Sequence, residues 1–268
     1  MGLFSWLLNL KKKDKKIKIG LALGSGGAKG FAELGALYAF EQNHIEFDYI
    51  AGTSIGSIIG AFYANGYNST DIFEMLKRVD AGDIKNLFMI KMDTFGLFRI
   101  IDKNIGVDNI EELKKPFSAI ATEMESGEEK VFSSGSVARA LCASCSYPPF
   151  FKPVENDGKN YIDGAFTNSI PADVVRKQGA DYVVGIDLSN HENRDSFLSR
   201  IFPTYKSKVD NPWQKGYENA DVILHPDLNE YTSFSFNQAM AMYDLGYKCA
   251  TLQLPKIKKD LEKLKKGK

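Results

Sequence analysis

Histidine, cysteine and long apolar runs are all scarce in this chain of 268 residues. Three cysteines are too few for a disulfide framework, and their use favours a reducing, cytoplasmic location. The formal net charge is zero, so no general attraction to nucleic acid is implied. Apolar residues at 44% and charged residues at 25% are ordinary for a globular protein. The length suits one large α/β domain or two small ones.

Two of the cysteines, Cys142 and Cys145, form a C-x-x-C pair, whereas Cys249 lies far along the chain. One such pair, without a second pair or a nearby histidine, is a weak signal for zinc. We therefore expect the pair to lie on a helical turn as two small core residues. Neither a metal nor a cofactor is expected.

The N-terminal segment, residues 1–16, begins with ten mostly apolar residues and then meets lysines. The apolar stretch is shorter than the about 20 residues that span a membrane. Its positive charge follows the apolar stretch, whereas a secretory signal carries that charge first. Trp6 stands where an N-myristoylation motif has Ser or Thr. Two interpretations stay open, namely an interfacial membrane anchor and a terminus that frays or packs on a partner.

Positive charge is concentrated at both ends of the chain. Residues 11–18 hold six lysines and one aspartate, and residues 256–268 hold seven lysines and two acidic residues, so each segment carries +5. The remainder carries −10, because the whole chain is neutral. The two basic ends are either solvated tails or contacts with an anionic membrane surface, such as the inner face of the cell membrane.

Hydrophobic periodicity predicts a β-α-β-α order in the first 65 or so residues, which is typical of a parallel sheet. The expected strands are 17–23 and 47–51, and the expected helices are 31–43 and 57–66.

The remaining pattern predicts more strands and helices, with no repeat or low-complexity linker. Further strands are expected at 117–124, 129–135, 160–166, 181–189 and 220–226, and helices at 70–80, 136–146 and 236–268. Ser69 or Thr70 is the expected cap of the helix at 70–80. The aromatic segment 84–102 either packs as core or covers a site for an apolar ligand. We predict one domain over residues 17–268.

A G-x-S-x-G motif places Ser54 between Gly52 and Gly56. The motif carries weight here because it lies between an expected strand and an expected helix. A serine at the tip of such a turn has a strained backbone, and glycines two residues away avoid collisions between its flanks. Ser54 is therefore the candidate nucleophile, against the alternative of a packing turn.

The glycine-rich segment 24–30, "GSGGAKG", fits neither a Walker loop nor a dinucleotide fingerprint. It still offers bare backbone amides at a helix N-terminus, which suit an anion. Beside a serine nucleophile, that anion is a tetrahedral oxyanion. The candidate donors are Gly26 and Gly27, and Lys29 either adds positive charge or is a solvated residue of the first helical turn.

A serine nucleophile needs a base, and two candidates stay open. Asp163 lies in an Asp-Gly turn at the end of an expected strand, where partial burial raises a carboxyl pKa toward that of a base. His225 also ends an expected strand and is suited to a Ser-Asp-His arrangement. His44 is expected at the surface, and His191 lies in a polar loop.

Together these motifs resemble the bacterial branch of the patatin-like phospholipases. The segments that carry the resemblance are "LALGSGGAKG" (21–30), "GTSIG" (52–56), "IATEMESGEEKVFSSG" (120–135), "ASCSYPPFFKPV" (143–154), "DGA" (163–165) and "FTNSIPADVVRKQGADYVVGIDLS" (166–189). They appear in the family's order and run from about residue 17 to 190. Ser25 departs from the glycine that is usual there.

The resemblance implies a three-layer α/β/α sandwich with a mostly parallel sheet. It further implies a Ser54–Asp163 dyad without histidine, an oxyanion held by Gly26 and Gly27, and a phospholipid or lysophospholipid substrate. The resemblance implies that neither a metal nor a cofactor takes part. Three alternatives stay open: an α/β-hydrolase esterase using His225, a lipid-binding protein without activity, and an acyltransferase with the same residues.

Overall fold

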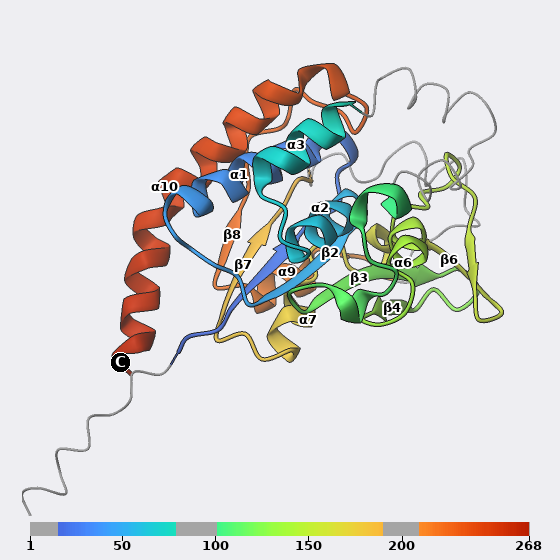
Figure 1. Cartoon of the computed structure of the whole chain (residues 1–268), viewed down its shortest axis with the longest axis horizontal. Coiled ribbons are helices and arrows are strands. Elements are labelled where there is room, and N and C mark those ends of the chain that lie inside the picture. Colours follow the sequence, from blue (N-terminus) through green and yellow to red (C-terminus); the bar gives the residue numbers. More distant parts are fainter. Residues whose placement is uncertain (1–15, 79–100, 190–208, 268) are drawn as a thin grey trace, which may run out of the picture.

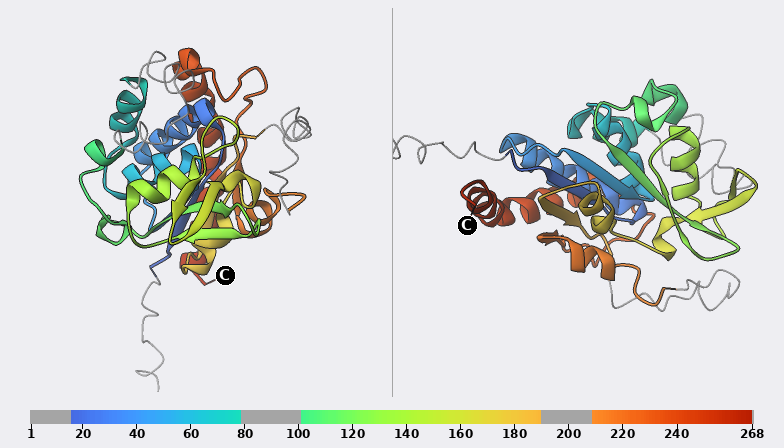
Figure 2. Two further views of the ribbon diagram at one scale, coloured as in Figure 1. Left: turned by 90° about the vertical axis from the view of Figure 1, so that its right-hand side faces the viewer. Right: turned by 90° about the horizontal axis from the view of Figure 1, so that it is seen from below.

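The computed structural model describes residues 16–78, 101–189 and 209–267. The expected anchor up to residue 15, His191 and residues 84–100 of the aromatic segment lie outside these ranges. Within them, one mixed sheet lies between two layers of helices (Figures 1 and 2). None of the described helices is both long and apolar enough to cross a membrane.

The sheet has eight strands in the order β5-β6-β3-β2-β1-β7-β8, and β4 pairs with β3 beside this path. The strands are β1 (Ile19–Leu23), β2 (Tyr49–Thr53), β3 (Phe117–Glu123), β4 (Glu129–Phe132), β5 (Val154–Asn156), β6 (Lys159–Asp163), β7 (Tyr182–Ile186) and β8 (Val222–Leu224). The pairs from β3 through β2, β1 and β7 to β8 are parallel, and those of β4, β5 and β6 are antiparallel. The expectation of an α/β fold with a mostly parallel sheet is confirmed.

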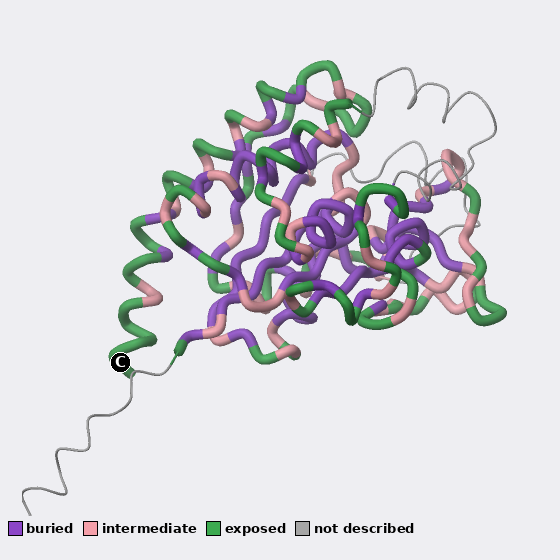
Figure 3. The backbone as a smooth tube through the Cα atoms, viewed as in Figure 1, coloured by how far each residue is buried: buried purple, intermediate pink, exposed green. Residues whose placement is uncertain are grey.

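Helices cover both faces of the sheet. They are α1 (Phe31–Gln42), α2 (Ile55–Ala64), α3 (Ser69–Arg78), α6 (Val137–Ser144), α7 (Ala172–Lys177), α9 (Gln214–Asn219) and α10 (Ala239–Lys265). Short 3-10 turns are η2 (Gly27–Gly30), η3 (Ile110–Glu112), η4 (Gly164–Phe166) and η7 (Phe236–Gln238). Helices α1, α2, α6 and α10 belong to one face, and α7 belongs to the other. Figure 3 shows the strands buried between these layers, with α10 exposed along its outer side.

Side chains alternate between the two cores along each central strand, as the strand period of two requires. In β1, Leu21 and Leu23 join the larger core under α1 and α2, whereas Ala22 joins the smaller core under α7. The same strand has Gly20 where a Cβ would lie 2.9 Å from Val175 of α7. Small residues on this face thus let α7 approach the sheet.

Helix α10 packs closely along α1 because two glycines remove side chains at the crossing. A Cβ on Gly35 of α1 would lie 1.9 Å from the Tyr243 carbonyl oxygen. A Cβ on Gly246 of α10 would lie 1.8 Å from the Ala32 carbonyl oxygen. Tyr38 then contacts the Tyr243 ring, with the centroids 6.1 Å apart.

The sequence located most elements to within a few residues, but it missed β5, α7 and α9. It was also wrong about the cap of α3, because the side chain of Asn68 accepts the Asp71 amide at 2.8 Å. The hydroxyl of Ser69 instead donates to Glu41 at 2.6 Å. The C-x-x-C prediction is confirmed, since Cys142 and Cys145 are buried at the end of α6.

Candidate active site

Ser54 occupies a strained turn between β2 and α2. Its φ of 55° and ψ of −126° lie in a region that residues with side chains rarely adopt. A Cβ on Gly52 would lie 2.2 Å from the Gly56 carbonyl oxygen, and one on Gly56 would lie 2.6 Å from the Gly24 carbonyl oxygen. Only glycine fits either position, as the G-x-S-x-G spacing predicted.

Asp163 reaches Ser54 because the chain crosses over β3 directly after β6. A Cβ on Gly164 would lie 2.3 Å from the carbonyl oxygen of Ile120 in β3. The Ser54 hydroxyl donates to Asp163 Oδ2 at 2.6 Å, and the Ala165 amide donates to Asp163 Oδ1 at 2.8 Å. A hydroxyl and a carboxyl that lie 109 positions apart in sequence thus share a hydrogen bond.

Burial dominates the electrostatics of this carboxyl. Asp163 is 1% exposed, and this desolvation raises its pKa to about 7 although the bonds from Ser54 and Ala165 favour the charged form. The group therefore titrates in the neutral range. That property suits a group that must accept and return a proton at physiological pH.

The glycine-rich segment forms the loop after β1, next to the Ser54 turn. Within the described residues, no hydrogen bond uses the amide of Gly26 or Gly27. The neighbouring amides are occupied, because Ser25 donates to the Ser169 carbonyl at 3.0 Å and Ala28 to the Ser233 carbonyl at 2.9 Å. The loop is therefore held on both sides and keeps two amides available for an anion.

The patatin-like phospholipase family model matches residues 21–176, which is more than half of the chain. The chain belongs to the patatin-like phospholipase family.

Curated relatives of this patatin-like chain are much longer proteins. Lysophospholipase NTE1 of Candida glabrata is 31% identical over 268 residues, covering 85% of this chain and 15% of that protein. Patatin-like phospholipase domain-containing protein 6 of Mus musculus is 31% identical over 232 residues, covering 80% and 16%. The chain thus spans about a sixth of the length of these relatives.

Two solved structures are similar at low sequence identity. VipD from Legionella pneumophila has a TM-score of 0.47 and 14% identity, covering 85% of this chain and 67% of its own. Type III effector protein ExoU has a TM-score of 0.49 and 12% identity, covering 90% and 53%.

In the patatin-like fold, the two candidate bases Asp163 and His225 lie at very different distances from Ser54. His225 follows β8, which lies three strands from β2, or roughly 14 Å along the sheet. It is exposed, and its Nε2 lies 2.9 Å from the Ser189 carbonyl oxygen. His44 is exposed as expected. Of the two candidates, Asp163 is the one that the fold brings to Ser54.

Lys29 is not the solvated residue that one interpretation of the sequence described. It lies in η2 and is 9% exposed. Burial lowers the pKa of its ammonium group, and the negative charge of Asp187 opposes that effect. Lys29 is therefore a buried residue of the glycine-rich segment.

The end of α6 holds the backbone on both sides of the Ser54–Asp163 pair, a feature that sequence reasoning missed. The Ser54 amide donates to Ser144 Oγ at 2.9 Å, and the Asp163 amide donates to the Ser146 carbonyl at 3.0 Å. Between them, burial and then the charge of Asp163 raise the pKa of the Cys145 thiol. This thiol therefore stays protonated and is a poor competing nucleophile.

Sequence reasoning also missed Glu33, whose only signal was one acidic residue among the apolar residues of the first turn of α1. Its carboxyl is fully buried and accepts the Gly24 amide at 2.7 Å.

Among the described residues, no group of three or more His, Cys, Asp or Glu side chains is arranged to hold a metal ion.

Proposed function

We propose that this protein is a serine lipid acyl hydrolase of the phospholipase A or lysophospholipase type. The observation that carries the proposal is the 2.6 Å hydrogen bond between Ser54, on a strained turn, and the buried carboxyl of Asp163. Family membership supports the same chemistry, and the named relatives are lysophospholipases or contain a phospholipase domain.

In the first half of the reaction, Ser54 Oγ attacks the ester carbonyl carbon while Asp163 takes the hydroxyl proton. The carbonyl oxygen becomes an oxyanion, which the amides of Gly26 and Gly27 stabilise, and the charge of Lys29 helps. A donor of this kind is worth about 3 kcal/mol. The tetrahedral intermediate then expels the alkoxide of the lipid, which takes the proton from Asp163 and leaves an acyl-Ser54.

In the second half, water attacks the acyl carbon and Asp163 accepts a proton from that water. The same two amides hold the second oxyanion. The intermediate collapses to a fatty acid and expels Ser54 Oγ, which recovers its proton from Asp163. Neither half calls for a metal or a cofactor. An alcohol in place of water would make the protein an acyltransferase, with the same residues in the same roles.

The finer expectations are part of the proposal. The substrate is a phospholipid or lysophospholipid, in keeping with the named lysophospholipases. The catalytic unit is one patatin-like domain over residues 17–268, in the bacterial branch of the family. It works in the cytoplasm, with peripheral contact to the inner membrane surface through its basic ends.

The proposal is tested by incubating the protein with a mixed lipid extract and identifying the products by mass spectrometry. We expect free fatty acids and the matching deacylated lipids with the wild type, and none with Ser54→Ala. Ser57→Ala is unsuitable as a control, since Ser57 Oγ bonds the Ser54 carbonyl oxygen at 2.6 Å. Ser126→Ala is the matched control and should hydrolyse normally, because Ser126 is only half-buried and lies in the turn between β3 and β4. Equal products from wild type and Ser54→Ala would refute the proposal.

The contrasting candidate is a lipid-binding protein without activity on the same fold. That protein would have no need for a strained serine and a buried carboxyl in hydrogen-bond contact. It would bind the extract, leave every lipid intact and fail to react with a fluorophosphonate probe. We expect the probe to modify Ser54.

A further inference from the structure

Glu33 is an acidic residue in an unusual place. It lies in the first turn of α1 and has no exposed surface. One carboxyl oxygen accepts the Gly24 amide at 2.7 Å, whereas the other has no hydrogen-bond partner among the described residues. A buried polar atom without a partner is rare enough in proteins to need an explanation.

An ionised carboxylate would be very costly at this position, because its charge would be taken out of water without a counter-ion. Burial raises the pKa of Glu33 well above its usual range, and the Gly24 amide is the only group of the described chain that opposes this. No lysine, arginine or histidine of the described residues offsets its charge. The site therefore favours the neutral form of Glu33 far more than water does.

The residue that Glu33 holds is the entry to the glycine loop. Gly24 follows β1, and a Cβ on it would lie 2.5 Å from the Ile186 carbonyl oxygen of β7. Its own carbonyl oxygen lies against Gly56, beside Ser54 in the strained turn. Gly24 is thus enclosed between β7 and that turn, and its amide is held by the hydrogen bond to Glu33. The free amides of Gly26 and Gly27 follow two and three residues later.

We propose that Glu33 is a positioning residue, which fixes the glycine loop through the Gly24 amide so that the following amides point at the oxyanion. It acts through Gly24 and touches neither substrate nor reacting atoms. This role rests on the proposed acyl-hydrolase function, because it concerns the oxyanion site of that reaction. Glu33 shares this task with Ser169, whose carbonyl oxygen accepts the Ser25 amide at 3.0 Å, and glycine itself restricts the backbone least.

Substitutions of Glu33 can separate the effect of its hydrogen-bond acceptor from the effect of its acidic group. Glu33→Gln keeps an acceptor for the Gly24 amide and stays neutral, so it reproduces the proposed state. Glu33→Met fills similar space without the acceptor and leaves a buried amide unpaired. Glu33→Asp keeps the acidic group but withdraws it by one methylene, and serves if Glu33→Met does not fold.

Ser118→Ala is the matched structural control. Ser118 is also fully buried and accepts a side-chain hydrogen bond, from Gln178 Nε2 at 2.9 Å. It lies near the start of β3, where it pairs with Ala51, whereas the Ser54 turn begins after Thr53, which pairs with Ile120 further along that strand. Its substitution removes one buried hydrogen bond without touching the glycine loop.

The experiment measures kcat and KM for hydrolysis of a short-chain ester, together with the rate of fluorophosphonate labelling and the melting temperature. We expect Glu33→Gln and Ser118→Ala to stay within about threefold of the wild type in kcat. Glu33→Met and Glu33→Asp should lose about 10- to 100-fold in kcat and in labelling rate, with KM within about threefold.

Three results would overturn the proposal. The first is that both Glu33→Met and Glu33→Asp keep a kcat within threefold of the wild-type value. The second is a loss in Glu33→Gln as large as in Glu33→Met, because a neutral acceptor should suffice. The third is a loss of kcat in Ser118→Ala as large as the loss in Glu33→Met, with the two variants equal in melting temperature. A wild type that neither hydrolyses esters nor reacts with the probe refutes the proposed function itself, and the role of Glu33 with it.

Discussion

The carboxyl of Asp163 has a pKa of about 7 because it is buried, and that value links activity to pH. Only the ionised form can take the proton from Ser54. The ionised fraction falls tenfold for each pH unit below the pKa. We therefore expect kcat/KM to rise with pH along a single limb and to level off above an apparent pKa near 7.

The measurement is a pH–rate profile with a soluble ester whose own groups do not titrate between pH 5 and 9. His225→Ala is the control, since an imidazole base would give a limb in the same range. The limb should be unchanged in His225→Ala. A flat profile in the wild type, or loss of the limb in His225→Ala, would contradict the assignment of Asp163 as base.

The same pKa predicts in which direction the free energy of unfolding changes with pH. The folded state keeps the Asp163 proton up to about pH 7, whereas the unfolded chain loses it near pH 4. The folded state thus binds more protons within this window, and the free energy of unfolding falls as pH rises through it. Asp163→Asn has no such loss, so it should be inactive yet more stable than wild type at pH 8, by on the order of 1–3 kcal/mol. Urea unfolding at pH 5 and pH 8 tests this, and a variant that is less stable at pH 8 would contradict it.

At the scale of elements, the strained turn and the glycine loop form one close contact between β2–α2 and β1–η2. A Cβ on Gly56 would lie 2.6 Å from the carbonyl oxygens of both Leu23 and Gly24. Gly56→Ala should therefore force the two segments apart, lower stability by about 1–3 kcal/mol and greatly slow fluorophosphonate labelling.

Gly60→Ala, in the same helix α2, is the matched control. Its Cβ would meet only side chains, the nearest being the Phe117 ring at 3.1 Å and Ile50 at 3.2 Å. Side chains can shift where backbone cannot, and alanine favours a helix interior by up to about 1 kcal/mol over glycine. Labelling of Gly60→Ala should match the wild type. Normal labelling of Gly56→Ala would contradict the close contact.

Most elements were predictable because their patterns are local. Strand β1 and helix α1 differ in hydrophobic period, and the glycines that separate them mark the boundary. What was not predictable is the antiparallel part of the sheet. The crossing of Gly164 over Ile120 depends on long-range pairing of β6 with β3, which no local pattern encodes.

The candidate site shows the same limit. Ser54, Gly26 and Gly27 lie in motifs whose spacing has a steric reason, so the sequence alone pointed to them. The choice between Asp163 and His225 depended on the resemblance, since both end strands. Glu33 was missed because burial of a charged residue depends on which surfaces pack over it, and sequence spacing does not reveal that.

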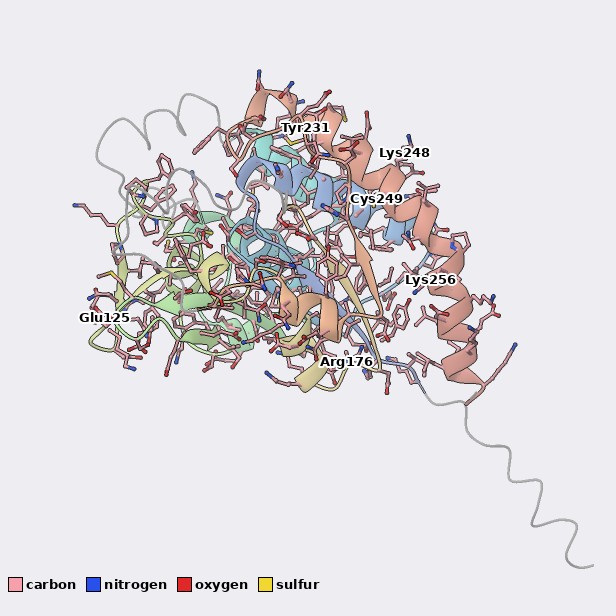
Figure 4. The ribbon with its side chains drawn as sticks, turned by 180° about the vertical axis from the view of Figure 1, so that it is seen from behind. Glu125, Arg176, Tyr231, Lys248, Cys249 and Lys256 are labelled. Atoms are coloured by element: carbon pink, nitrogen blue, oxygen red, sulfur yellow. The ribbon has the colours of Figure 1, made fainter. Side chains whose placement is uncertain are left out.

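At the scale of the whole molecule, the basic C-terminal half of α10 lies far from the candidate site. The helix has 27 residues, or about 40 Å, and starts near the loop that contacts Gly27. Its later part is tied to the start of β8, since Lys256 Nζ donates to the Asp221 carbonyl at 3.0 Å, and to the start of β7, since the Tyr182 hydroxyl donates to Asp260 Oδ2 at 3.5 Å. Figure 4 shows Lys248 and Lys256 along this helix, with Tyr231 near its beginning.

This separation makes membrane binding testable apart from catalysis. Deleting residues 1–16, or replacing Lys263, Lys265 and Lys266 with glutamine, should weaken binding to anionic vesicles and leave hydrolysis of a soluble ester unchanged. The charge-matched control replaces three exposed lysines elsewhere, which are Lys103, Lys114 and Lys130. Vesicle co-sedimentation at low salt is the measurement. Unchanged binding in both test variants would refute membrane contact through the basic ends.

The most direct test of the whole account compares Asp163→Asn with His225→Ala for hydrolysis of one ester, with folding checked for each variant. We predict that Asp163→Asn abolishes hydrolysis and that His225→Ala keeps nearly all of it. Activity retained by Asp163→Asn and lost in His225→Ala would contradict the account.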